Sequence, residues 1–61
     1  MYKLVLNGTK SYDSDSVDKC MIETFKIWPN AHFSGWQETT NETWLNIYNN
    51  NILVGKIFEV T

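Results

Sequence analysis

A single segment of this chain has the periodicity of an amphipathic helix, and it limits what the rest can form. Six side chains follow the i, i+3, i+4, i+7, i+8 and i+11 spacing that places residues on one helical face. They are Val17, Cys20, Met21, Thr24, Phe25 and Trp28. One helix covers only one face of a sheet. A chain with one helix and several strands therefore leaves the other sheet face open, or buries it against another molecule.

The ends of this helix are marked by residues that favour helix termini. The run Asp13-Ser14-Asp15-Ser16 offers side-chain oxygens that cap the free N–H groups of the first turn. Asp15 and Asp18 also place negative charge at the positive end of the helix dipole. Pro29 lacks an N–H group and restricts the residue before it. The sequence therefore predicts a helix over about residues 15–28.

The other segments predict strands. Residues 2–7 alternate and are rich in aliphatic side chains, and Asn7-Gly8 is a strong turn signal. After the helix come strand-like runs at 31–39, 43–49 and 52–61, the last two joined by a tight turn of asparagines. Residues 9–13 are polar and predict either a loop or a short second strand.

These elements predict the fold class and the domain organisation. Consecutive strands joined by short turns form antiparallel sheets. We expect one α+β domain over residues 1–61, with a single helix packed on one face of a three- to four-stranded antiparallel sheet. The order is β-α-β-β-β, or β-β-α-β-β-β if residues 9–13 pair.

Alternation within the strands divides the side chains between two faces. The face expected to pack on the helix holds most of the aliphatic side chains. These core residues are Leu4, Leu6, Phe33, Leu45, Ile47, Phe58 and Val60. The uncovered face is predicted to hold Trp44, Tyr48 and Ile57, together with Trp36 and Val5.

Large aromatic side chains on an uncovered sheet face indicate an interaction surface. Exposed apolar patches mark binding sites, and Trp and Tyr are frequent among the residues that dominate binding energies. Two interpretations without a partner stay open. Cross-strand aromatic pairs also stabilise sheets, and a bulge at Gly35 or Gly55 would move the tryptophans into the core.

The composition narrows the classes of function. The net charge is −2 and the five basic residues, all lysine, are scattered, whereas binding to a phosphate backbone relies on a basic groove. This argues against nucleic acid as the partner, although bases do stack on aromatic sheet faces. No apolar run reaches the roughly 18 residues that span a membrane. With no secretion signal and a single free thiol at Cys20, we expect a cytoplasmic protein without a membrane partner.

No set of residues predicts catalysis or metal binding. The segment from Asp13 resembles the start of an EF-hand loop, but the sixth and twelfth positions hold Asp18 and Thr24 instead of Gly and Glu. Cys20 lies on the predicted buried helix face, and no residue is obviously placed to orient His32 as its base. We therefore expect a protein that is not an enzyme and that uses no cofactor or metal.

Two resemblances add to this interpretation. The opening Tyr2-Lys3-Leu4-Val5-Leu6-Asn7-Gly8 resembles the first strand and turn of the immunoglobulin-binding domains of streptococcal protein G. The ending Lys56-Ile57-Phe58-Glu59-Val60-Thr61 is similar to the last strand of that family. The resemblance implies a ββαββ fold whose helix and third strand bind antibody Fc. In general character, the chain also resembles small phage accessory proteins, which inhibit or redirect a host protein.

Together these features predict a small non-enzymatic protein that binds another protein, as a phage-type inhibitor or modulator of a host protein does. The predicted binding residues are an aromatic and apolar patch with an acidic region for electrostatic steering. They are Trp36, Trp44, Tyr48 and Ile57, with Asp13 and Asp15. The alternatives are a homodimer without a separate ligand, a nucleic-acid-binding module, or an immunoglobulin-binding domain.

Overall fold

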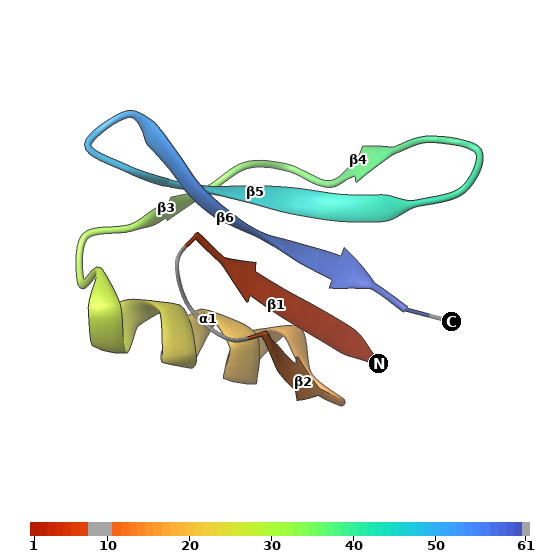
Figure 1. Cartoon of the computed structure of the whole chain (residues 1–61), viewed down its shortest axis with the longest axis horizontal. Coiled ribbons are helices and arrows are strands. Elements are labelled where there is room, and N and C mark those ends of the chain that lie inside the picture. Colours follow the sequence, from red (N-terminus) through yellow and green to blue (C-terminus); the bar gives the residue numbers. More distant parts are fainter. Residues whose placement is uncertain (8–10, 61) are drawn as a thin grey trace.

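The computed structural model describes residues 1–7 and 11–60, and it shows one helix packed on one face of an antiparallel sheet (Figure 1). Helix α1 (Val17–Ile27) connects the first two strands to the last four. The strands are β1 (Tyr2–Leu6), β2 (Tyr12–Ser14), β3 (His32–Phe33), β4 (Gln37–Glu38), β5 (Thr43–Asn49) and β6 (Ile52–Glu59). The predicted α+β class with a single helix is confirmed.

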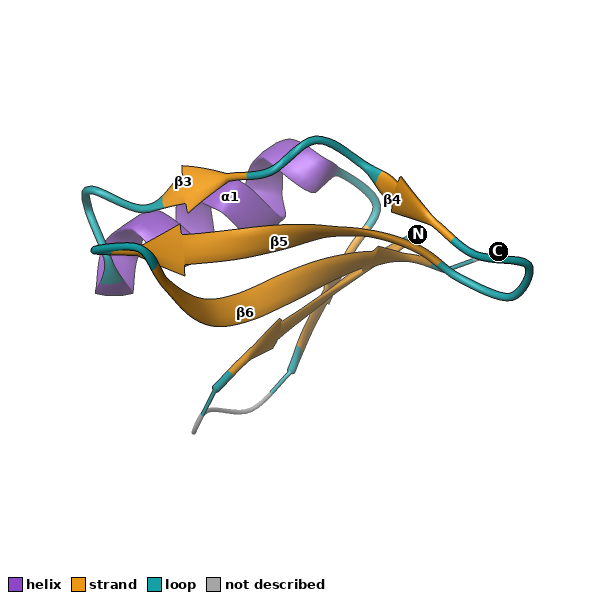
Figure 2. Cartoon of the chain, turned by 90° about the horizontal axis from the view of Figure 1, so that it is seen from above, coloured by secondary structure: helices purple, strands orange, loops and turns teal. Residues whose placement is uncertain are grey.

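The sheet is built around two long strands. Its order is β2-β1-β6-β5-β3, with β4 paired to the other end of β5, and every pair is antiparallel. The β5–β6 hairpin forms the centre, and β1 pairs along β6 (Figure 1). Figure 2 shows that α1 lies on one side of this sheet only.

Two differences from the predicted strand pattern raise the number of strands to six. The predicted strand at 31–39 is interrupted, because residues 34–36 leave the ladder between β3 and β4. Ser34 bridges the interruption: its N–H donates to the Asn46 carbonyl over 2.9 Å, and its hydroxyl accepts from the Asn46 N–H over 2.8 Å. The predicted optional second strand is present as β2, while residues 9 and 10 of that segment lie outside the described residues.

The helix begins and ends where the capping residues predict, within two residues. Ser16 is the N-cap, and its hydroxyl accepts from the Asp18 N–H over 3.2 Å. The Ser14 hydroxyl accepts in turn from the Ser16 N–H over 3.2 Å. At the other end, the Trp28 N–H donates to the Thr24 carbonyl over 2.9 Å, just before Pro29. These contacts satisfy backbone groups that a helix end leaves without partners.

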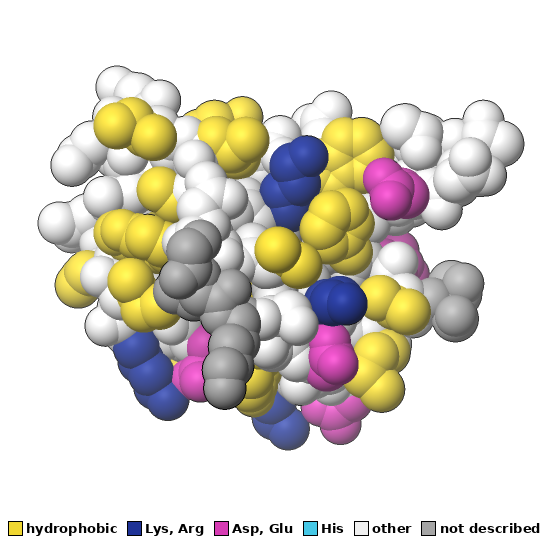
Figure 3. Space-filling model, viewed as in Figure 1, with side chains coloured by type: hydrophobic (Ala, Val, Ile, Leu, Met, Phe, Trp, Pro, Cys, Tyr) yellow, Lys and Arg dark blue, Asp and Glu magenta, His cyan; other side chains and the backbone are white. Residues whose placement is uncertain are grey.

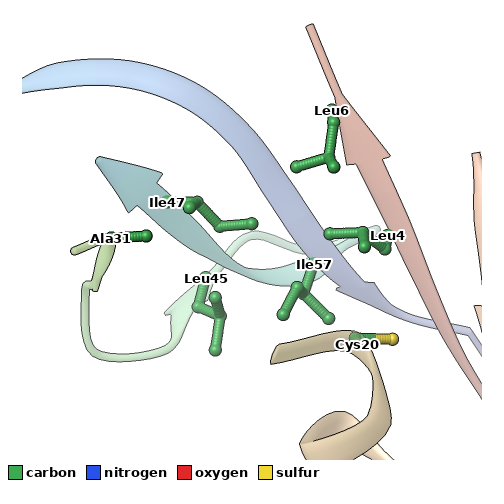
Figure 4. Packing of buried hydrophobic residues seen from close by; sticks show 7 residues of the cluster. All are labelled: Leu4, Leu6, Cys20, Ala31, Leu45, Ile47 and Ile57. Carbon is green, nitrogen blue, oxygen red and sulfur yellow. The ribbon is translucent and has the colours of Figure 1, made fainter. Parts of the chain in front are cut away.

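The core lies between α1 and the facing side of the sheet (Figure 4). Leu4, Ile57 and Leu45 form one row across β1, β6 and β5, so each packs beside its cross-strand neighbour. The helix contributes Cys20, and the buried Thr24 hydroxyl donates to the Cys20 carbonyl over 2.9 Å. The buried apolar residues are Leu4, Leu6, Cys20, Ala31, Leu45, Ile47 and Ile57.

The core corrects the predicted faces of the last strand. Ile57 was expected on the uncovered face and is fully buried, while Phe58 was expected in the core and lies on the opposite face. Register decides this, because Ile57 is the β6 residue aligned with Leu4 and Leu45. Val60, also expected in the core, lies past the end of β6 and is 42% exposed.

The predicted buried face of the helix also includes one residue that the structure leaves exposed. Phe25 is 41% exposed, at the flank of α1. Its ring packs edge-on against Phe33 of β3, with 5.4 Å between the ring centroids. Val17, Met21 and Trp28 pack against the core as expected.

The turn between β5 and β6 follows the predicted chemistry. Asn50 and Asn51 have φ angles of 52° and 65°, the left-handed region that asparagine tolerates better than most residues. The pairing of β5 with β6 also shifts register between Ile47 and Tyr48, just before this turn. Opposite it, buried Gly55 lies so close to β1 that an added Cβ would be 2.6 Å from the Val5 carbonyl oxygen. The irregularity falls beside Gly55, whereas Gly35 lies in the loop between β3 and β4.

Candidate functional site

The sheet face opposite α1 carries two aligned rows of side chains. In the first row, Lys3 of β1 lies opposite Phe58 of β6, and Phe58 lies opposite Trp44 of β5. Directly paired residues share a face, so these three side chains are neighbours. The second row runs through Val5, Lys56 and Asn46. We call this surface the open face and define it as Lys3, Val5, Trp44, Asn46, Lys56 and Phe58.

The open face alternates apolar and positively charged side chains. Its two lysines sit diagonally, each beside an apolar or aromatic neighbour in the same row. Figure 3 shows this side of the molecule, with hydrophobic side chains gathered between two lysines near its centre. Figure 2 shows that no helix covers this side in the described part of the chain. The face is therefore accessible to a partner.

Trp44 is held in place by two neighbours on the same face. Its indole N–H donates to the Asn46 side-chain oxygen over 3.1 Å, two residues along β5. The Lys56 ammonium lies 5.5 Å from the centre of the Trp44 ring, a cation–π distance. A large aromatic side chain that is already ordered loses little conformational freedom when it binds. Trp44 is half-buried, so part of its ring stays available.

An open groove of about 420 Å³ lies where the open face meets the turn between β4 and β5. Its apolar surface comes from Val5, Phe58 and Val60. Lys3 and Glu42 line the same groove, so both signs of charge meet there. Glu59 also borders the groove, but it pairs with Tyr2, which packs against the core on the sheet face that α1 covers.

The turn that carries Glu42 is ordered by Thr39. The Thr39 N–H donates to the Glu42 carbonyl over 2.8 Å. The Thr39 hydroxyl accepts from the Asn41 and Glu42 N–H groups over 3.3 and 3.1 Å. These three hydrogen bonds within residues 39–42 hold the backbone of Glu42 beside the groove that this residue lines.

The structure separates the four aromatic and apolar residues that were predicted to bind together. Trp44 and Tyr48 lie on the side away from α1, because both alternate with the buried Leu45 and Ile47. Ile57 lies in the core. Trp36 lies on the other side of the sheet: its ring centroid is 6.1 Å from that of Tyr2, which packs against the core. The loop at 34–36 breaks the alternation from which the position of Trp36 was predicted.

The two acidic residues that were predicted to steer binding also lie in different surroundings. Asp13 of β2 lies opposite Lys3 of β1 and therefore borders the open face. Asp15 follows β2 and forms an ion pair with Lys19, one helical turn along, over 3.3 Å. The hydrogen bond and the charge of Lys19 lower the pKa of the Asp15 carboxyl. Only Asp13 is placed to act together with the open face.

Lys3, Lys56 and Phe58 were not predicted as site residues. A signal for them was present, because Lys56 precedes Phe58 by two residues and shares its strand face. Placing Phe58 in the core would also bury a lysine without a partner, which costs far more than an aromatic ring gains.

The remaining candidate groups do not form a reactive site. Cys20 is fully buried in the core, and burial, together with the charge of Asp13, raises the pKa of its thiol. His32 is exposed on β3, at the edge of the sheet. Within residues 1–7 and 11–60, no three His, Cys, Asp or Glu side chains are grouped so that they could hold a metal ion. In the same residues, no helix has the length and apolar character needed to cross a bilayer.

Comparisons with known proteins give no relative from which a function could be transferred. No family model, no curated protein and no solved structure matches this chain. The resemblance to the immunoglobulin-binding domains of protein G thus stays a prediction. The segments that carry it, 2–8 and 56–61, fall largely on the adjacent strands β1 and β6.

Proposed function

We propose that this protein is a small non-enzymatic binding module that attaches stoichiometrically to another protein through the open face. The observation that carries this proposal is the contiguous row Lys3–Phe58–Trp44 on a sheet face that α1 does not cover. As in small phage inhibitors, binding alone would produce the effect on the partner. No bond in the partner is made or broken.

The chemistry of the open face fits protein recognition. Aromatic side chains in well-packed positions supply most of the energy of typical interfaces, and charged neighbours set orientation. Trp44 and Phe58 are the aromatic pair, and Lys3 and Lys56 are the charged neighbours. A typical stable interface covers about 800 Å² on each partner, which is about a fifth of the 4242 Å² that this chain exposes.

A capture experiment with matched variants tests the proposal. We expect the wild-type protein, immobilised and exposed to an extract of its native cells, to retain a partner identified by mass spectrometry. Val5→Arg introduces a long charged side chain into the open face at a position 36% exposed, and we expect it to abolish capture. Ile22→Arg makes the same chemical change on the exposed surface of α1 and should leave capture unchanged.

The fold of both variants must be checked before the capture result is interpreted. Circular dichroism and urea unfolding should show native structure in each, because both substituted side chains lie outside the core cluster. Equal capture by wild type, Val5→Arg and Ile22→Arg would exclude the open face as the binding surface. Loss with Ile22→Arg alone would move the site to the helix.

A second candidate is single-stranded nucleic acid, favoured by one observation: the two lysines of the open face flank the aromatic pair. Bases stack on aromatic rings, while lysines contact phosphates. Asp13 and Glu42 border the same surface and oppose a phosphate backbone. Titration of tryptophan fluorescence with a single-stranded RNA oligonucleotide at low and high salt separates the candidates. Strongly salt-dependent quenching would favour nucleic acid over protein.

A further inference from the structure

We propose that the open face fits a second copy of this chain. The two copies would pack face to face about a two-fold axis, with Lys3 of each lying against Glu42 of the other. This inference rests on the proposed function, since it names the partner of the same surface.

The groove beside the open face presents charges that form no ion pair among residues 1–7 and 11–60, although Asp13 lies opposite Lys3 across the β1–β2 pair. Both ion pairs among the described residues join side chains at or on the helix, Lys19 with Asp15 and Lys26 with Glu23. In this part of the chain, Lys3 and Glu42 belong to no ion pair, although both line the groove. The groove therefore offers one cation and one carboxylate to an incoming surface.

A surface with both signs of charge constrains its partner. A purely basic partner would place like charge against Lys3, and a purely acidic partner would place like charge against Glu42. Like charges brought together at an interface cost several kcal/mol. The complementary surface must carry a carboxylate opposite Lys3 and a cation opposite Glu42.

A rotated copy of the same groove meets this requirement. In a two-fold contact, residue i of one copy meets residue j of the other, and j meets i. An axis passing near Phe58, between Lys3 and Glu42, would bring each lysine to the Glu42 carboxylate of the opposite copy. The apolar residues of the groove, Val5, Phe58 and Val60, would then pack near the axis, where their burial stabilises association.

Sedimentation equilibrium of the pure protein tests this inference. We expect the mass to rise from the 7.1 kDa of one chain to twice that value between about 1 μM and about 1 mM, the range of weak to moderate protein association. Lys3→Glu and Glu42→Lys should each weaken dimerisation by about tenfold or more, because each brings like charges together in both halves of the contact.

Mixing the two variants gives the sharpest result. In a heterodimer of Lys3→Glu with Glu42→Lys, the introduced carboxylate faces the introduced ammonium, and the two native residues face each other. Association should therefore return towards the wild-type strength. Asp15→Lys and Lys19→Glu make equivalent charge changes on the helix side. Each of these variants should dimerise as strongly as the wild type.

Three outcomes would overturn the inference. A chain that stays monomeric at every concentration excludes the dimer. If Val5→Arg still abolishes capture of another protein in that case, the proposed function stands without it. A dimer that ignores both groove substitutions but dissociates with Ile22→Arg uses the helix surface instead. Variants that stay weak when mixed show that Lys3 and Glu42 do not face each other.

Discussion

The ammonium group of Lys56 lies 5.5 Å from the centre of the Trp44 ring, across the β5–β6 pair on the open face. The pairing of Ile57 with Leu4 and Leu45 sets the orientation of β6, and this orientation leaves the Lys56 side chain on the same side as Phe58, where water can reach it. Lys56 therefore shares the open face with Phe58 and also holds Trp44, the main aromatic side chain of the candidate site, in place.

Removing the charge of Lys56 should loosen Trp44. Lys56→Met keeps the length of the side chain but loses the cation–π contact, which contributes about 0.5–1 kcal/mol in partly exposed sites. We expect a loss of stability of that size in urea unfolding, together with a shift in tryptophan fluorescence. Lys56→Arg keeps the charge and should behave like the wild type. Identical unfolding of both variants would show that the contact contributes nothing.

Adjacent residues of β6 should respond differently to truncation. Ile57→Ala removes a fully buried side chain between Leu4 and Leu45, so we expect a loss of about 2–5 kcal/mol. Phe58→Ala removes a larger but only half-buried ring and should cost less. Unfolding in urea measures both. A larger loss for Phe58→Ala would place Phe58 in the core and reverse the faces of the strand.

The close approach of β6 to β1 makes Gly55 the most sensitive glycine among those described. Gly55→Ala would place a methyl group 2.6 Å from the Val5 carbonyl oxygen and 2.7 Å from the Leu6 side chain. The strands must separate to accommodate it, which we expect to cost about 1–3 kcal/mol. Gly35→Ala is the matched control, because no heavy atom lies within 4 Å of its added Cβ. The midpoint temperature of thermal unfolding should be much lower for Gly55→Ala than for Gly35→Ala. Equal midpoints would contradict the close approach of β6 to β1.

The buried thiol of Cys20 should make stability depend on pH in the alkaline range. Burial raises its pKa above the usual value of 9.0, so the folded state keeps the proton that the unfolded chain releases. This contribution is complete below the unfolded pKa and is lost as the pH rises past it. Between about pH 8 and pH 10, stability should therefore fall more steeply for the wild type than for Cys20→Ala. Parallel curves would show that the thiol ionises equally in both states.

The elements that were predicted correctly are those in which a single sequence pattern dominates. The helical spacing from Val17 to Trp28 has no competing interpretation, and its ends follow from Ser16 and Pro29. In β5, polar and large aromatic residues alternate with Leu45 and Ile47, so the faces of that strand were also predicted correctly. The asparagine turn has its own backbone signature.

The parts that were predicted wrongly depend on contacts between distant segments. In β6, apolar residues occur on both faces, and pairing with Leu4 and Leu45 selects Ile57 for the core. The interruption before Trp36 depends on Ser34 bonding to Asn46, twelve residues away. The candidate site inherited both errors, because its residues were assigned by alternation. Trp44 was assigned correctly since its own strand is regular.

The sheet ends on either side in very short strands. The β2 edge has three residues, and the opposite edge is divided between β3 and β4, with two residues each. Fibrils grow when an extended segment adds along a long unpaired strand edge. In residues 1–7 and 11–60, neither edge offers a continuous row of free backbone groups of that length. Concentrated solutions should therefore resist amyloid conversion, and crowding would drive contact between broad surfaces instead.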